Sequence, residues 1–298
     1  MRVWSRSEQK YIEEQEYNKE LLDFLYHTVP GRAMLKTVTN PMVSEINAWK
    51  ERLPSSVGKI KPFVEQYHID LSECERKNFR SFDDFFTRKR PYHTEAEDDE
   101  LIAVADARLI ARPVSDGLIL RVKNSSYTLR ELVGCEFDMT RYEGGTCLIY
   151  RLAMEDYHRY VYLDEGRVGK QVSIPGQLHT IRPVSVQCKA YSSNHRICTR
   201  LHTMRYGDVL QIEVGALMVG KIQNHPAKRF VRLQEKGYFR HGGSTILQFF
   251  EPGVIALDED IRTQSMRGTE CLVHIGETIG RRQSVENYHP NYKKNNYW

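Results

Sequence analysis

Residues 238–250, YFRHGGSTILQFF, hold the feature that most constrains this chain. The stretch after Ser244 is rich in β-branched and aromatic residues, which favour a half-buried β-strand. The preceding Gly242 and Gly243 have two interpretations. They allow positive φ angles in a turn or bulge between strands. Alternatively, the unhindered carbonyl of Gly243 is attacked by the hydroxyl of Ser244, which makes the pair a self-cleavage site. Residues elsewhere in the chain must decide.

Composition favours a soluble or peripheral protein with a real core. The 298 residues suffice for one large domain or two small ones, and 40% are hydrophobic. A net charge of +4 does not indicate nucleic-acid binding, although it is compatible with a local basic face for anionic lipid. The six cysteines include no C-x-x-C pair, which argues against a zinc site and favours a reducing compartment. No apolar run approaches the roughly 20 residues of a membrane-spanning helix, and no signal-peptide core follows Met1.

The front of the chain, residues 1 to about 90, has the pattern of amphipathic helices. Apolar residues recur at three- and four-residue spacings from Tyr17 to Val29, and Pro30-Gly31 is expected to stop that helix. A second amphipathic stretch covers residues 32–49, and Ser81 is expected to cap a short helix over residues 82–88. These helices either pack on the core or place an apolar face in a membrane interface. The two functions are compatible.

From residue 101 onward, short strand-like runs alternate with turn signals. Strands are expected at 118–122, 146–152, 167–174, 196–202, 209–222, 244–250 and 271–275. The chain is therefore predicted to be α+β, with amphipathic helices first and then a β-rich core of short, mostly antiparallel strands. The acidic run at 95–100 suggests a boundary between a helical region at 1–95 and a catalytic core at 96–298.

Common catalytic fingerprints are missing from the sequence. It contains no G-x-G-x-x-G or G-x-x-x-x-G-K-[ST] nucleotide motif, no G-x-S-x-G elbow and no H-E-x-x-H metal motif, so no metal is expected. What remains is a possible nucleophile, Ser244, with histidines and carboxylates that only folding can bring to it.

Eight short motifs occur in the order seen in prokaryotic-type phosphatidylserine decarboxylases, and this resemblance covers nearly the whole chain. Each motif alone is weak, but their shared order favours self-cleavage at Gly243-Ser244 over the turn. The motifs are SFDDFFTR at 81–88, Asp106 in VADA, Tyr127-Thr128-Leu129 with Leu132, DYHRY at 156–160, PGQL at 175–178, NHR at 194–196, VGALMVG at 214–220 and GGST at 242–245.

The resemblance implies a proenzyme without an external cofactor. In such enzymes the serine hydroxyl, here that of Ser244, attacks the preceding carbonyl, here that of Gly243. The peptide bond becomes an ester, β-elimination breaks the ester, and the new amino-terminal residue becomes a pyruvoyl group. This covalent pyruvoyl group forms a Schiff base with the substrate amine and accepts the electrons of the departing carboxylate. The implied reaction converts phosphatidylserine to phosphatidylethanolamine and carbon dioxide.

By similarity, Asp106 is the carboxylate that orients the base for self-processing. The family often has a second histidine three residues after the one that matches His158, but this chain has Val161 there. His158, His179 and His241 are therefore alternative bases. His241 is the weaker candidate, because it lies only three residues before the nucleophile. In the mature enzyme, His158 is the candidate to contact the substrate carboxylate or to protonate the carbanion.

The implied partner is phosphatidylserine in the membrane, with the helical front docked peripherally on the cytoplasmic face. The processed chains are expected to remain associated, and a homodimer is compatible with the resemblance. Two alternatives stay open. One is a pyruvoyl decarboxylase that acts on another amino-acid head group. The other is a non-catalytic lipid-binding relative, which the valine at position 161 keeps under consideration.

Overall fold

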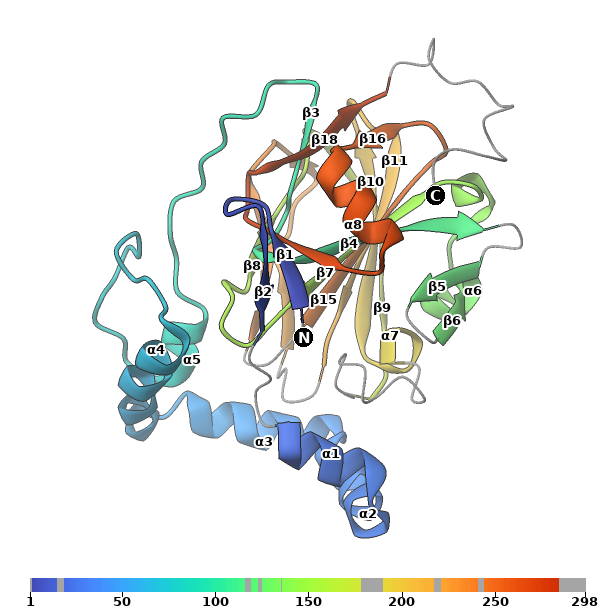
Figure 1. Ribbon diagram of the computed structural model, residues 1–298. Helices are drawn as coiled ribbons and strands as arrows, with labels where there is room; N and C mark the ends of the chain where they lie inside the picture. Colours follow the sequence, from blue (N-terminus) through green and yellow to red (C-terminus); the bar gives the residue numbers. More distant parts are fainter. Residues whose placement is uncertain are drawn as a thin grey trace.

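The computed structural model describes residues 2–14, 19–115, 119–122, 125–134, 136–177, 190–216, 221–240 and 244–283. A large twisted sheet forms its centre, and helices from the front of the chain lie below and to one side of this sheet (Figure 1). The expected α+β class is confirmed, as is the mostly antiparallel pairing of the strands.

The helical front contains five α-helices and one 3-10 helix. They are α1 (Lys19–His27), α2 (Val29–Val38), α3 (Pro41–Glu51), η1 (Pro54–Lys59), α4 (Ile60–Tyr67) and α5 (Phe82–Phe86). Pro30 does not stop a helix as predicted. It lies in the first turn of α2, where its missing N–H costs nothing, and Thr28 caps that helix by accepting the N–H of Gly31. A side chain at Gly31 would collide with the carbonyl of Phe24, so this corner between α1 and α2 requires glycine.

The prediction of helix at the start of the chain is wrong for residues 2–13. Strands β1 (Arg2–Ser5) and β2 (Lys10–Glu13) form a hairpin there. Strand β1 pairs in parallel with β17 (Glu270–Val273), so the beginning of the chain is part of the main sheet. The side chain of Arg6 supports this pairing through ion pairs with Asp258, Asp260 and Glu277.

The main sheet has twelve strands, in the order β13-β9-β10-β11-β15-β7-β4-β17-β1-β2, with β5 paired to β4 and β6 paired to β5. Two three-stranded sheets accompany it, β12-β14-β8 and β16-β18-β3. The remaining strands are β3 (Glu100–Ile102), β4 (Ala107–Ser115), β5 (Ile119–Val122), β6 (Ser125–Thr128), β7 (Thr146–Leu152), β8 (Arg159–Val161), β9 (Gly166–Ile174), β10 (Arg196–Thr203), β11 (Asp208–Val214), β12 (Lys221–Asn224), β13 (Arg229–Phe230), β14 (Glu235–Arg240), β15 (Ser244–Phe250), β16 (Ile255–Leu257) and β18 (Thr278–Arg282).

Apolar residues cover both faces of the main sheet. On β15 the side chains alternate, so Ile246 and Phe250 join one core cluster while Leu247 and Phe249 join the other. Short helices lie at the edges of this core: α6 (Leu129–Val133), η2 (Thr140–Tyr142), α7 (Ala190–Ser193) and α8 (Glu259–Met266). Strand β15 is thus the buried centre of the fold, paired with β11 on one side and β7 on the other.

All seven predicted strand regions contain strands. The predicted strands at 146–152 and 244–250 match β7 and β15, and the run at 209–222 divides into β11 and the start of β12. None of the described helices is both long and apolar enough to cross a bilayer.

Candidate active site

Ser244 is the first residue of β15 and lies opposite Leu152, the last residue of β7. Its side chain is fully buried on the face that carries Ile246. Ser244 is held by its pairing with β7, the pairing of β15 with β11 begins at the next residue, and the hydroxyl is shielded from water. The described part of the chain resumes at Ser244, so Gly243 and the rest of the expected cleavage site lie outside it.

His158 is the histidine that the structure brings to Ser244. It lies in the connection between β7 and β8, and its Nδ1 is 3.4 Å from Ser244 Oγ. Its Nε2 is 2.8 Å from the carbonyl oxygen of Ala153. A carbonyl oxygen only accepts, so Nε2 carries the proton and the Nδ1 of the neutral ring is an acceptor. The ring is therefore oriented to take a proton from the Ser244 hydroxyl.

The loop that supplies the Ala153 carbonyl is held by a buried carboxylate. Asp156 accepts the N–H of Ala153 at 2.6 Å and forms an ion pair with Arg108 at the start of β4. Burial raises the pKa of Asp156 to about 6 against the opposing effect of Arg108. The first residue of the DYH motif thus positions the loop that orients the third, His158.

Helix α5 connects the helical front to this site. Ser81 caps it as predicted, accepting the N–H of Asp84 at 3.1 Å. The ring of Phe86 stacks on His158, with 4.3 Å between ring centroids and 28° between planes. The sequence predicted a short helix capped by Ser81, but not that one of its phenylalanines packs on the candidate base.

Asp106 lies just before β4 and has other partners. Both of its carboxylate oxygens accept hydrogen bonds from Arg90, and Oδ1 also accepts the N–H of Ile275. His274 Nδ1 lies 3.9 Å from Oδ2. Burial raises the pKa of the Asp106 carboxyl, but the contacts with His274 and Arg90 outweigh burial and leave the pKa below its ordinary value. The orienting role expected for Asp106 stays a prediction, because the ring of His158 is oriented here by Ala153.

The other sequence candidates have different positions. Val161 is fully buried in β8, and its N–H donates to the carbonyl of Val104 at 3.0 Å, so the residue where the family often has a histidine is part of the core. His179 and His241 lie outside the described residues. The described part of the chain contains no group of three His, Cys, Asp or Glu side chains arranged to hold a metal ion.

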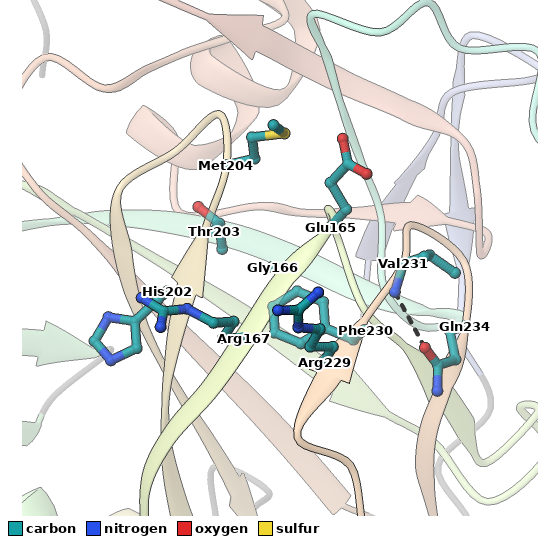
Figure 2. A pocket seen from close by; sticks show the side chains of 10 residues that line it. All are labelled: Glu165, Gly166, Arg167, His202, Thr203, Met204, Arg229, Phe230, Val231 and Gln234. Carbon is teal, nitrogen blue, oxygen red and sulfur yellow. Dashed lines mark hydrogen bonds between the residues drawn. The ribbon is translucent and has the colours of Figure 1, made fainter.

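A cavity of about 570 Å³ lies at the opposite end of the sheet from Ser244. It is bordered by β9, β10 and β13, and its lining includes Arg167, Arg229 and Phe230 (Figure 2). Arg167 and Ile174 lie near opposite ends of β9, roughly 23 Å apart at about 3.3 Å per residue. Ile174 belongs to the Ser244 end through the pairing of β9 with β10 and of β10 with β11. The cavity is therefore separate from the pairing of Ser244 with His158.

Comparison with known proteins agrees with the motif order. Residues 82–281 match the family model of phosphatidylserine decarboxylase. The phosphatidylserine decarboxylase proenzyme 2 of Clostridium acetobutylicum is 44% identical over 285 residues, which cover 93% of this chain and 97% of that protein. A phosphatidylserine decarboxylase proenzyme of Desulfitobacterium hafniense is 37% identical over 293 residues, which cover 95% of this chain and 98% of that protein. This chain therefore belongs to the phosphatidylserine decarboxylase family.

Proposed function

We propose that this chain is a proenzyme that cleaves itself between Gly243 and Ser244 and then decarboxylates phosphatidylserine to phosphatidylethanolamine and carbon dioxide. Membership of the family supports the reaction. The observation that carries the cleavage step is the 3.4 Å contact between Ser244 Oγ and His158 Nδ1 in a buried site.

In the cleavage step, His158 takes the proton of the Ser244 hydroxyl while the oxygen attacks the carbonyl carbon of Gly243. The bond from that carbon to the nitrogen of Ser244 breaks, the proton passes to the nitrogen, and an ester replaces the peptide bond. β-Elimination removes the Cα proton of residue 244 and releases Gly243 as a carboxylate. Water then replaces the nitrogen, which leaves as ammonia, and a pyruvoyl group remains at the new amino terminus.

The surroundings of Ser244 suit such a group. When formed, it supplies an electrophilic carbonyl that accepts the electrons left by a departing carboxylate. Burial of Ser244 limits competition from water while its hydroxyl attacks Gly243, and Phe86 packs on the ring of His158 beside it. In the mature enzyme, His158 contacts the substrate carboxylate or returns a proton to the carbon that has lost carbon dioxide. Asp106 acts beside this site by holding Arg90 and the turn after β17.

The processed chains remain associated in this proposal. Strand β15 would begin the carboxy-terminal chain, and it is hydrogen-bonded along its length to β11 and β7 of the amino-terminal chain. Strand β17 would likewise stay paired with β4 and β1. Cleavage breaks one peptide bond but leaves these ladders and both apolar faces of the sheet intact.

The helical front supplies the proposed membrane-docking surface. Six large apolar side chains on α1–α3 are exposed, and Val29 and Trp49 are 73% and 57% accessible. Exposed apolar groups of this density mark interaction sites, and a bilayer interface accommodates them together with flanking Lys and Arg. Free cysteines, of which Cys147, Cys198 and Cys271 are buried, support placing this peripheral protein on the cytoplasmic face, where thiols stay reduced. The six residues are Leu21, Phe24, Val29, Met34, Ile46 and Trp49.

Vesicle flotation tests the docking surface. Val29→Asp combined with Trp49→Asp should abolish flotation with phosphatidylserine vesicles while self-cleavage continues. Met204→Asp, a change at another exposed apolar residue far from the helices, is the matched control and should float normally. Equal flotation of all three proteins would refute docking through α1–α3.

The cleavage step is tested by His158→Ala in a cell-free translation time course followed by gel electrophoresis. Loss of a general base should slow the appearance of two chains by roughly 10²- to 10⁴-fold. His202→Ala, at the far end of β10, serves as the histidine control and should cleave normally. His179→Ala and His241→Ala complete the set. Cleavage that fails in either of these but continues in His158→Ala would assign the base to that residue instead.

A further inference from the structure

Asp83 and Arg240 form an incomplete charge pair next to the candidate active site. Asp83 is on α5, one helical turn before Phe86, whose ring stacks on His158. Arg240 is the last residue of β14, four residues before Ser244. Residues three apart share a helix face, so Asp83 lies on the side of α5 that meets the site. The two charged groups thus approach the site from different elements.

The hydrogen-bonding capacity of both side chains is only partly used. Arg240 Nη2 is 3.8 Å from Asp83 Oδ2, a separation too long for a hydrogen bond. Asp83 Oδ1 and Arg240 Nε are buried and have no hydrogen-bond partner among the residues that the structure describes. Leaving such an atom unsatisfied costs about 1–3 kcal/mol, and more for charged groups. An unsatisfied acceptor on Asp83 and an unsatisfied donor on Arg240 suit a ligand that carries both a positive and a negative charge.

The N-terminus of α5 is capped without the Asp83 carboxylate. Ser81 caps α5, and the neighbouring carboxylate of Asp84 accepts the backbone N–H of Arg80 at 2.9 Å. The carboxylate of Asp83 instead points to Arg240, and its pKa is raised because burial outweighs the nearby Arg240 and Arg52. The local structure of α5 therefore explains the contact of the Asp84 carboxylate, but not why the Asp83 carboxylate points to Arg240.

We infer that Asp83 and Arg240 form the head-group subsite, in which Asp83 accepts hydrogen bonds from the substrate ammonium as the lipid binds, before that amine condenses with the pyruvoyl carbonyl, and Arg240 donates to the phosphodiester. This inference rests on the proposed function. The phosphodiester is the better partner for Arg240 than the carboxylate, because a cation on the carboxylate would stabilise the ground state and oppose its departure as neutral carbon dioxide. In the head group a short carbon chain joins an ammonium, which suits Asp83 Oδ1, to a phosphodiester, which suits Arg240 Nε.

Inhibition by soluble head groups tests the assignment directly. Decarboxylation of phosphatidylserine in mixed micelles is measured with glycerophosphoethanolamine or ethanolamine as inhibitor. In the parent enzyme glycerophosphoethanolamine should inhibit at a much lower concentration than ethanolamine. In Arg240→Gln the ratio of the two inhibitory concentrations should fall toward one, because the phosphodiester has lost its partner. Asp83→Asn should raise KM for phosphatidylserine by roughly 10- to 100-fold with little change in kcat, as expected for one lost charge-assisted hydrogen bond.

Asp84→Asn is the matched control, because it removes the same charge one residue away and should leave KM unchanged. An unchanged KM in Asp83→Asn, equal increases in both variants, or an unchanged inhibitor ratio in Arg240→Gln would overturn the inference. Intact mass of the parent enzyme separates this failure from failure of the proposed function, in which the parent itself is uncleaved.

A binding measurement covers variants that do not cleave. Calorimetry with glycerophosphoethanolamine is performed on Ser244→Ala protein with and without Asp83→Asn. Binding should weaken by at least tenfold in the double variant. Equal affinities, or no binding to Ser244→Ala protein, would overturn the subsite.

Discussion

A buried ion pair between Lys236 and Glu213 allows a quantitative prediction about the strand that leads to the cleavage site. Lys236 is on β14 and Glu213 on β11, both at most 1% exposed, with 2.8 Å between Nζ and Oε1. Glu213 also accepts hydrogen bonds from Gln211 at 2.7 Å and from Asn224 at 3.1 Å. The carboxylate is thus fully dependent on partners inside the protein.

Lys236→Met removes the cation and leaves the Glu213 carboxylate buried. Breaking a buried pair in this way costs about 3–5 kcal/mol of unfolding free energy. The double variant Lys236→Met/Glu213→Gln removes both charges and keeps amide hydrogen bonding to Asn224, so it should recover most of that loss. Lys170→Met is the control, because Lys170 and Glu136 form an exposed pair that contributes only about 0–1 kcal/mol.

Urea denaturation measures these differences. All variants are made in Ser244→Ala protein, so that each sample is a single uncleaved chain. The reasoning would be refuted if Lys236→Met cost less than about 1 kcal/mol, within the range of an exposed pair. It would also be refuted if the double variant were as unstable as the single one, because the loss would then come from packing and not from an unpaired charge.

Two further predictions concern groups around the site. Phe86→Leu removes the ring that stacks on His158, so self-cleavage should slow by about 3- to 10-fold, the equivalent of about 0.5–1.5 kcal/mol of aromatic contact; a time course with an unchanged rate would contradict this. His274 has a raised pKa because of its contact with Asp106, so its stabilising effect is complete below the unfolded-state pKa of about 6.5 and disappears as pH rises through the folded-state value. His274→Gln should therefore lower the Tm of Ser244→Ala protein below about pH 6 and leave it unchanged near pH 9; a loss of equal size at both pH values would count against the ion pair.

Local patterns predicted the central strands well and the edges poorly. The run from Ser244 to Phe250 is recognisable because it is rich in β-branched and aromatic residues, and the structure buries the whole strand. The prediction of helix was wrong for the hairpin at Arg2–Glu13. Strand β1 pairs in parallel with β17, which begins at Glu270, and a pairing between such distant segments leaves no local pattern in the sequence. Helix α8 was also missed within the β-rich region, since its weakly amphipathic sequence has no strong helical period.

The candidate site was predictable as a set of residues but not as an arrangement. Motif order identified Ser244, His158 and Asp106, and the structure brings the first two together. The bond from His158 to the Ala153 carbonyl could not be read from the sequence, because any residue type offers a carbonyl. Likewise, the sequence does not show the partners of Asp106. One is Arg90, and the other is the backbone N–H of Ile275 after β17, more than 160 residues further along the chain.

The central claim is that Ser244 cleaves the chain and becomes its cofactor. Intact mass spectrometry of the denatured, reduced protein beside its Ser244→Ala variant tests it most directly. The account predicts two chains divided after residue 243, with the smaller one lighter than its encoded peptide by one ammonia, and a single chain in the variant. A single full-length chain in both samples would contradict the account and favour a lipid-binding protein that has lost the reaction.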